Sequence, residues 1–193
     1  MARPRSFDLD AALDDALNVF WARGYEATSI CDLKEAIGIE TGSLYKAFGS
    51  KKELYEKALR RYLDRGLEFQ REHVFSSDDV WQAMAQVLDS AAVMATEGDR
   101  RGCFAINCAV DAAPHDPDVL EILKNHDRNI MRLFTERLAE GQAAGSVTKA
   151  EPAKDLARFV FATIGGLQVQ GRSGVSRASL RATARLAAGA LAP

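Results

Sequence analysis

The sequence predicts an all-α fold of about nine helices. Apolar residues recur three and four positions apart through most of the 193 residues, which is the spacing of one helix face. Glycine, proline and capping residues interrupt this pattern and separate the helices. No segment reads convincingly as a strand, and no internal repeat is visible. With 47% apolar residues, the chain is able to bury a substantial core.

The first helix is expected from Asp8 to Gly24. Acidic residues at its start suit the positive end of the helix dipole, and glycine suits its C-terminal end. The apolar residues on one face are Leu9, Leu13, Ala16, Leu17 and Phe20. We expect this helix to pack over the next two and to fix the angle between them.

Two short helices joined by a tight turn are expected within residues 28–51. Ser29 and Asp32 have the spacing of a capping box, and Gly38 can take the left-handed conformation that ends a helix. The second helix begins with small polar side chains, which let its backbone approach another surface closely. Its apolar residues, four positions apart, are Leu44 and Phe48. This arrangement is typical of a helix-turn-helix, whose second helix enters the major groove of DNA.

The same stretch resembles the DNA-binding signature of the TetR/AcrR family of bacterial regulators, over about residues 7–63. The matching segments are Thr28-Ser29-Ile30, Asp32-Leu33, Ala36-Ile37-Gly38-Ile39, Gly42-Ser43-Leu44-Tyr45 and Phe48-x-Ser50-Lys51. Two residues depart from the family pattern. Lys34 replaces a small residue, so its stem is expected to extend outward, and Glu40 stands where Ser or Thr is frequent, so the helix cap is altered.

The resemblance implies a DNA-binding domain at residues 6–66 and an effector-binding and dimerisation domain at residues 67–193. It implies a homodimeric repressor that a small-molecule effector releases from a palindromic operator in double-stranded DNA. No cofactor is expected, and no metal, because the three histidines show no metal-ligand spacing.

The candidate DNA contacts occupy the helix-turn-helix. Free N–H groups where Thr28 and Ser29 begin a helix suit a phosphate. The first turn of the reading helix can face base edges with Glu40, Thr41, Gly42 and Ser43. Positive charge comes from Lys46 and Lys51, and the family assigns phosphate contacts to Tyr45 and Lys51. Alternatively, Tyr45 is a half-buried ring that holds the turn together.

Charge supports DNA binding only locally, because the net charge is −2. Basic residues gather at Lys46, Lys51, Lys52, Lys57, Arg60 and Arg61. Without the helix-turn-helix, such a run would be read as a solvated helix face. Arg3 and Arg5 lie on a short N-terminal arm, which is either frayed or in weak contact with a phosphate. The chain lacks a secretory signal and a membrane-spanning run, so a cytoplasmic location is expected.

The remaining helices follow at about residues 50–71, 80–96, 103–113 and 119–141, then after Pro152 and in an Ala-rich final segment. Residues 171–174 are expected to form the turn before that segment. In the family, the last two helices pair with their copies in a second subunit. The corresponding candidates for a dimer interface are Phe159, Ile164, Leu167, Leu180, Ala184, Ala187 and Leu191.

An effector pocket of mostly apolar character is expected in the second domain. Its candidate lining residues are Phe69, Trp81, Met84, Phe104, Asn107, Cys108, Met131, Phe134 and Phe161. The plainer interpretation is that most of them are ordinary core, and that the protein is a helix-turn-helix adaptor without a cavity.

Cys103 suggests a different kind of control. It follows Arg100, Arg101 and Gly102 at an expected helix start, where cations and the helix dipole stabilise a thiolate. It could therefore act as a redox or electrophile switch, or simply be a small buried apolar residue. A thiol-dependent enzyme that pairs Cys103 or Cys108 with His115 is a further alternative, but no third orienting residue accompanies them.

Overall fold

The computed structural model describes residues 7–193 and is all-helical within them. The nine helices are α1 (Leu9–Arg23), α2 (Ile30–Ile37), α3 (Thr41–Phe48), α4 (Lys51–Val74), α5 (Val80–Met94), α6 (Phe104–Asp111), α7 (Pro117–Ala144), α8 (Ala153–Arg172) and α9 (Arg177–Gly189). None of these helices is long and apolar enough to cross a membrane. The predicted arm residues Arg3 and Arg5 lie outside the described residues.

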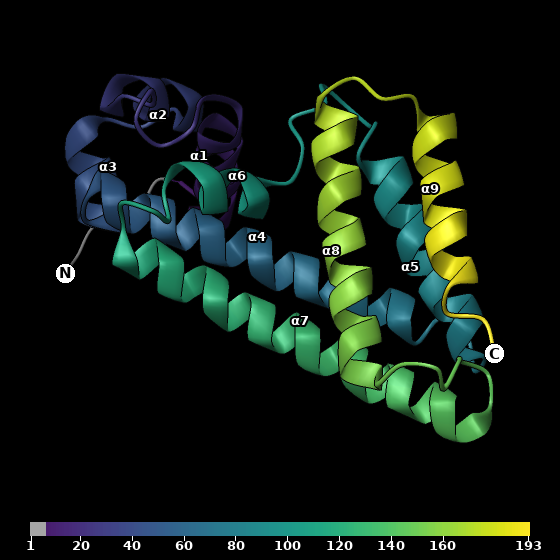
Figure 1. Cartoon of the computed structure of the whole chain (residues 1–193). Coiled ribbons are helices and arrows are strands. Elements are labelled where there is room, and N and C mark those ends of the chain that lie inside the picture. The colour runs from purple at the N-terminus through teal and green to yellow at the C-terminus, as the bar shows by residue number, and fades with distance from the viewer. Residues whose placement is uncertain (1–6) are drawn as a thin grey trace.

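The molecule is elongated, with α1, α2 and α3 at one end and α5, α8 and α9 at the other (Figure 1). The long helices α4 and α7 lie side by side and connect the two ends (Figure 1). Buried apolar residues form two clusters. One joins α1–α4 with α6 and the start of α7, and the other joins α5 with α7, α8 and α9.

Local chemistry explains most helix ends. Gly24 caps α1, and Gly38 caps α2 in the left-handed conformation with φ 72°. The predicted capping box is confirmed, because Ser29 Oγ accepts from the Asp32 amide while the Asp32 carboxylate accepts from the Ser29 amide. Glu40 makes no side-chain cap on α3, as its departure from the family pattern predicted.

Several boundaries differ from the prediction by a few residues, and two of the differences have a clear local cause. Helix α7 begins two residues early, at Pro117, because Asp116 caps it and proline suits the first helical position. Helix α8 continues to Arg172, so Gly171 lies within a helix and not in a turn. There Gly171 is buried against the backbone of Ala95, where the absence of a side chain lets α8 approach the end of α5 closely.

Candidate nucleic-acid interface and ligand cavity

The first turn of α3 faces solvent, as a reading helix requires. Thr41, Gly42 and Ser43 are exposed, whereas Leu44 and Phe48 are buried and anchor the helix on the core beneath. The Glu40 carboxylate, also exposed, accepts from Lys34 Nζ at 2.9 Å. Lys34 thus extends outward, as predicted.

Tyr45 and Lys46 extend this exposed surface along α3. The Tyr45 residue is 44% exposed, so its ring is half-buried and part of it is open to a DNA partner. Lys51 lies at the start of α4, with its Nζ 4.3 Å from the centroid of the Tyr25 ring. Together these residues give a small, polar and positively charged surface around α3.

Thr28 does not belong to this surface. It is 1% exposed, and its hydroxyl donates to the Gly24 carbonyl at 2.7 Å. Its amide is paired with the Tyr25 carbonyl. Thr28 therefore joins α1 to α2, and neither its amide nor its hydroxyl is free to donate to a phosphate, which is the role the sequence predicted for its backbone N–H. The neighbouring Ser29 is exposed, but its hydroxyl serves the capping box.

Half of the predicted basic cluster is already paired within the chain. Lys52 Nζ bonds Asp116 and Asp118 at 3.1 and 2.6 Å, which joins the first turns of α4 and α7. Lys57 Nζ donates to the Phe48 carbonyl, and Arg61 bonds Asp14. The cations of this cluster that remain for phosphate are Lys46, Lys51 and Arg60, because salt bridges occupy Lys52 and Arg61 and a backbone carbonyl occupies Lys57.

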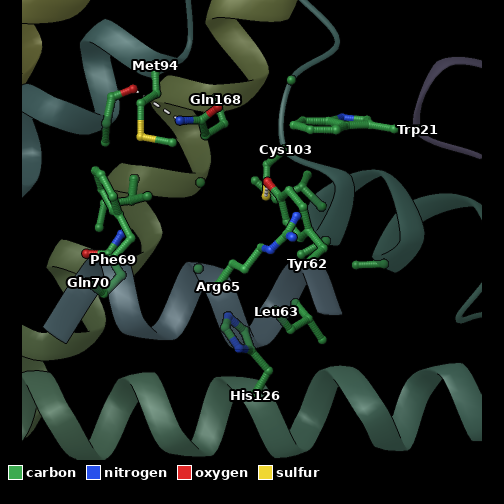
Figure 2. Close-up of a pocket in the computed structure, with 18 of the residues that line it drawn as sticks. Trp21, Tyr62, Leu63, Arg65, Phe69, Gln70, Met94, Cys103, His126 and Gln168 are labelled. Atoms are coloured by element: carbon green, nitrogen blue, oxygen red, sulfur yellow. Dashed lines mark hydrogen bonds between the residues drawn. The ribbon is translucent and has the colours of Figure 1, made fainter. Parts of the chain in front are cut away.

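A cavity of about 860 Å³ lies between the two ends of the molecule, bounded by α1, α4, α5, α6, α7, α8 and the loop before α6. Figure 2 shows Trp21, Tyr62 and Cys103 at one end and Phe69, Gln70, Met94 and Gln168 at the other. Of the nine predicted pocket residues, three line it: Phe69, Phe134 and Phe161. The presence of this cavity counts against the alternative interpretation, in which the protein is a helix-turn-helix adaptor without a cavity.

The other six predicted pocket residues lie elsewhere. Met84, Phe104 and Cys108 are buried in the core clusters. Trp81 packs at the α5–α9 contact and donates its indole N–H to the Ala188 carbonyl at 2.8 Å. Asn107 donates to the Arg101 carbonyl, and Met131 faces a separate shallow groove on α7.

The cavity wall is mainly apolar but contains several polar groups. Gln168 donates to the Ala91 carbonyl, and the Cys103 thiol accepts from the Tyr62 hydroxyl at 3.3 Å. Burial lowers the pKa of His126, which is therefore neutral near pH 7. Two buried polar atoms in this wall, Trp21 Nε1 and Gln70 Oε1, have no hydrogen-bond partner among the described residues. The sequence did not suggest Trp21, because α1 was expected to serve only the DNA-binding end, and no motif singled out Gln70 on α4.

Cys103 lies directly before α6, at its N-cap, as predicted. The nearby cation that was expected to stabilise a thiolate points elsewhere. The Arg101 guanidinium bonds Asp99 and Asn18 and lies on the face of Trp21. Cys108 is buried beside the Tyr55 hydroxyl, and burial raises its pKa to about 12.

The predicted dimer-interface residues are mostly inside this chain. Leu167, Leu180, Ala184, Ala187 and Leu191 are all buried in the cluster shared by α5, α8 and α9. Ile164 is partly buried and lines the cavity, which leaves Phe159 as the exposed member of the set. The large apolar side chains that α8 and α9 do expose are Phe159, Val169 and Leu186, the last 78% exposed.

Comparison with known proteins agrees with this architecture. Residues 12–58 match the family model described as bacterial regulatory proteins, tetR family, and residues 79–186 match the tetracyclin repressor-like C-terminal domain. The HTH-type transcriptional repressor ComR of Escherichia coli K12 is 35% identical over 176 residues, 90% of this chain and 84% of ComR. The E. coli repressor BdcR is 27% identical over 98% of this chain and 91% of its own.

A solved structure of a cysteine mutant of the TetR family regulator CifR, complexed with 26 bp double-strand operator DNA, superposes with a TM-score of 0.88. It is 34% identical and covers 98% of this chain and all of its own. The first family model covers α1 to the start of α4 and includes the exposed α3, and the second runs from α5 into α9. The chain belongs to the TetR family of bacterial regulatory proteins, and it is a DNA-binding transcriptional regulator.

Proposed function

We propose that this chain is a homodimeric repressor that binds a palindromic operator and leaves it when a small molecule enters the cavity. The proposal assigns DNA reading to residues 6–66 and effector binding with dimerisation to residues 67–193. The observation that carries it is the outward presentation of α3, with exposed polar residues on its first turn and Leu44 and Phe48 anchoring it.

A second copy is needed because α3 has only eight residues and spans few base pairs. Two copies about one turn of DNA apart would read both halves of a palindrome. Exposed Phe159 and Val169 on α8, with Leu186 on α9, are large apolar side chains available for that association. We therefore keep Phe159 from the predicted interface and replace its buried members on α8 and α9 with Val169 and Leu186.

Release by a small molecule follows from where the cavity lies. Its wall includes Leu17 and Trp21 of α1 together with Phe134 of α7 and Phe161 of α8. A ligand there would contact the DNA-binding end and the C-terminal helices at once. If it favours a different spacing of the two α3 helices, ligand and DNA weaken each other by the same coupling free energy, typically ~1–3 kcal/mol.

The test begins with DNA fragments selected from genomic DNA by the wild-type protein. Tyr45→Ala and Lys51→Ala should each weaken binding to the selected operator about tenfold while leaving thermal unfolding unchanged, because both remove phosphate contacts. Lys149→Ala, which removes one exposed cation from the loop after α7, is the matched control. Fluorescence anisotropy at fixed salt measures all three. Wild-type affinity in both α3-surface variants would contradict the assigned interface.

Cys103 supports a second candidate, a repressor controlled by an oxidant or electrophile. Its thiol lines the cavity and accepts a hydrogen bond from Tyr62, so a reagent that enters would reach it. A Cys103→Ser variant should then stay on the operator at an electrophile dose that releases wild type. Equal release of both proteins would remove this candidate.

We propose no enzymatic activity for the chain. Its relatives are transcriptional regulators. The high pKa of Cys108 leaves it protonated near pH 7, so it is a poor nucleophile. The free thiols suit a reducing compartment such as the cytoplasm.

A further inference from the structure

One side chain of the cavity wall, Arg101, carries an organic cation, its guanidinium group. Arg101 lies in the loop between α5 and α6, and its guanidinium carbon is 4.5 Å from the centroid of the Trp21 ring. Its Nη1 donates to Asn18 Oδ1 at 3.2 Å, and its Nε donates to Asp99 Oδ1 at 2.8 Å. Asn18, Trp21, Asp99 and Arg101 all line the cavity. An aromatic face with two oxygen acceptors is a complete environment for a delocalised cation.

Aromatic rings hold the Trp21 side chain in place. Tyr62 packs edge-on against Trp21, with ring centroids 5.0 Å apart, and Phe104 lies 6.3 Å away. Tyr62 is in turn fixed through its hydrogen bond to Cys103 (Figure 2). The indole face is therefore a preorganised surface whose position does not depend on Arg101.

The charges around the cavity favour a cation over an anion. Its lining contains four carboxylates, Asp14, Glu97, Asp99 and Asp127, and two guanidinium groups, Arg65 and Arg101. The charge of Asp14 is already compensated, because Arg61 and Arg65 each donate two hydrogen bonds to its carboxylate. If Arg101 leaves the wall, Glu97, Asp99 and Asp127 remain without a cation from the lining. An incoming carboxylate would meet their repulsion, and an incoming cation would replace the charge that was lost.

The contact made by Arg101 also joins the two ends of the molecule. Asn18 and Trp21 belong to α1, which packs on α2 and α4, whereas Arg101 belongs to the loop that leads from α5 into α6. The loop backbone is left-handed at Gly98, Arg100 and Gly102, with φ values of 59°, 55° and 72°. Arg101 thus holds an irregular segment against α1 by side-chain contacts.

We propose that the face of Trp21 is a subsite for an aromatic organic cation, such as an amidinium or guanidinium, that binds by displacing Arg101. Arg101 is an internal stand-in for the ligand, and its displacement frees the α5–α6 loop from α1. The apolar remainder of the cavity, toward Phe134 and Phe161, holds the hydrocarbon part of the ligand. The consequence for DNA affinity rests on the proposed function, but the binding step does not.

Calorimetry with two probes of nearly equal size tests the binding step in the absence of DNA. The probes are 2-naphthamidinium, which is cationic, and 2-naphthamide, which is neutral. Wild type should bind the cation more tightly than the amide. Arg101→Ala should bind the cation roughly 3- to 30-fold more tightly than wild type, because the competing guanidinium is gone. Binding of the amide should change much less.

Three variants separate the subsite from general effects on the fold. Trp21→Leu should lose the preference for the cation and still bind the amide. Arg101→Lys should bind the cation with an affinity between those of wild type and Arg101→Ala, because lysine restores a cation but not the planar contact. Arg71→Ala, which removes an exposed guanidinium of α4 outside the cavity, should match wild type with both probes.

Operator binding is measured separately by anisotropy with and without 2-naphthamidinium. Release of DNA by the cation but not by the amide supports the whole proposal. If the cation binds as described but DNA stays bound, the subsite stands and the proposed ligand release fails. The subsite itself is overturned if Arg101→Ala binds the cation no more tightly than wild type, or if neither protein binds it.

Discussion

At the scale of single residues, Asp14 connects α1 to α4. Its two carboxylate oxygens accept four hydrogen bonds, two from Arg61 at 2.7 and 2.9 Å and two from Arg65 at 2.6 and 2.9 Å. These contacts hold the pKa of the Asp14 carboxyl well below its ordinary value near 4. Because the folded state keeps the proton off this group, its contribution to stability is present above about pH 4 and is lost as the pH falls further.

Replacement of Asp14 by Asn should therefore destabilise the protein in a pH-dependent way. Asp14 is about a third exposed, so solvent screening keeps the expected loss to about 1 kcal/mol at pH 7. The difference from wild type should shrink as the pH falls from 5 toward 2. Urea unfolding across this range measures it, with exposed Asp15→Asn as the control that removes the same charge from α1. A difference that stays constant down to pH 2 would be evidence against this assignment.

At the scale of helices, α8 closely approaches the end of α5. A Cβ built on Gly171 would lie 2.2 Å from the Ala95 carbonyl oxygen, so the two helices have no room for a methyl group. Gly66, in the middle of α4, has no atom within 4 Å of the same position. The two glycines thus separate the effect of packing from that of helix propensity.

Gly171→Ala should lower stability by about 1–3 kcal/mol, because the backbone of α5 must move to accept the methyl group. Gly66→Ala should be neutral or stabilising by up to about 1 kcal/mol, because alanine favours a helix interior. Thermal unfolding of the two variants beside wild type makes the comparison. Equal unfolding temperatures for both would show that α8 does not approach α5 this closely.

The helices themselves were predictable from the sequence because their determinants are local. Ser29 with Asp32 defined the start of α2, Gly38 its end, and the spacing of Leu44 and Phe48 the buried side of α3. The apolar stripe of α9 was also visible, but periodicity cannot tell whether the chain's own core or a second copy covers it. Leu180 and Leu191 proved to be core, while the exposed Leu186 lies between them.

The cavity could not be predicted in this way, because it joins residues far apart in the chain. Trp21 and Arg101 are 80 positions apart in the sequence, and only the packing of the α5–α6 loop on α1 brings them together. Aromatic residues in the second half looked equally suited to a pocket or a core. Phe134 and Phe161 line the cavity, whereas Phe104 is buried beside Tyr55 and Tyr62.

At the scale of the whole molecule, DNA reading depends on two copies of α3 held at a fixed separation. Helices α8 and α9, which carry the exposed Phe159, Val169 and Leu186, lie at the end of the molecule opposite α3, so a dimer formed through them leaves both copies of α3 uncovered (Figure 1). Linking two half-site contacts in this way typically raises affinity by about 100-fold or more over one contact.

The most direct test is the ratio of affinities for the full palindromic operator and for one isolated half-site, measured by anisotropy at one salt concentration. Wild type should favour the full site by about 100-fold or more. Leu186→Glu places a charge on the proposed interface at a position that is open to solvent in the single chain, so it should fold normally and bring the ratio close to that of independent sites. Equal wild-type affinity for the two DNAs would contradict a dimer that reads DNA with paired α3 helices.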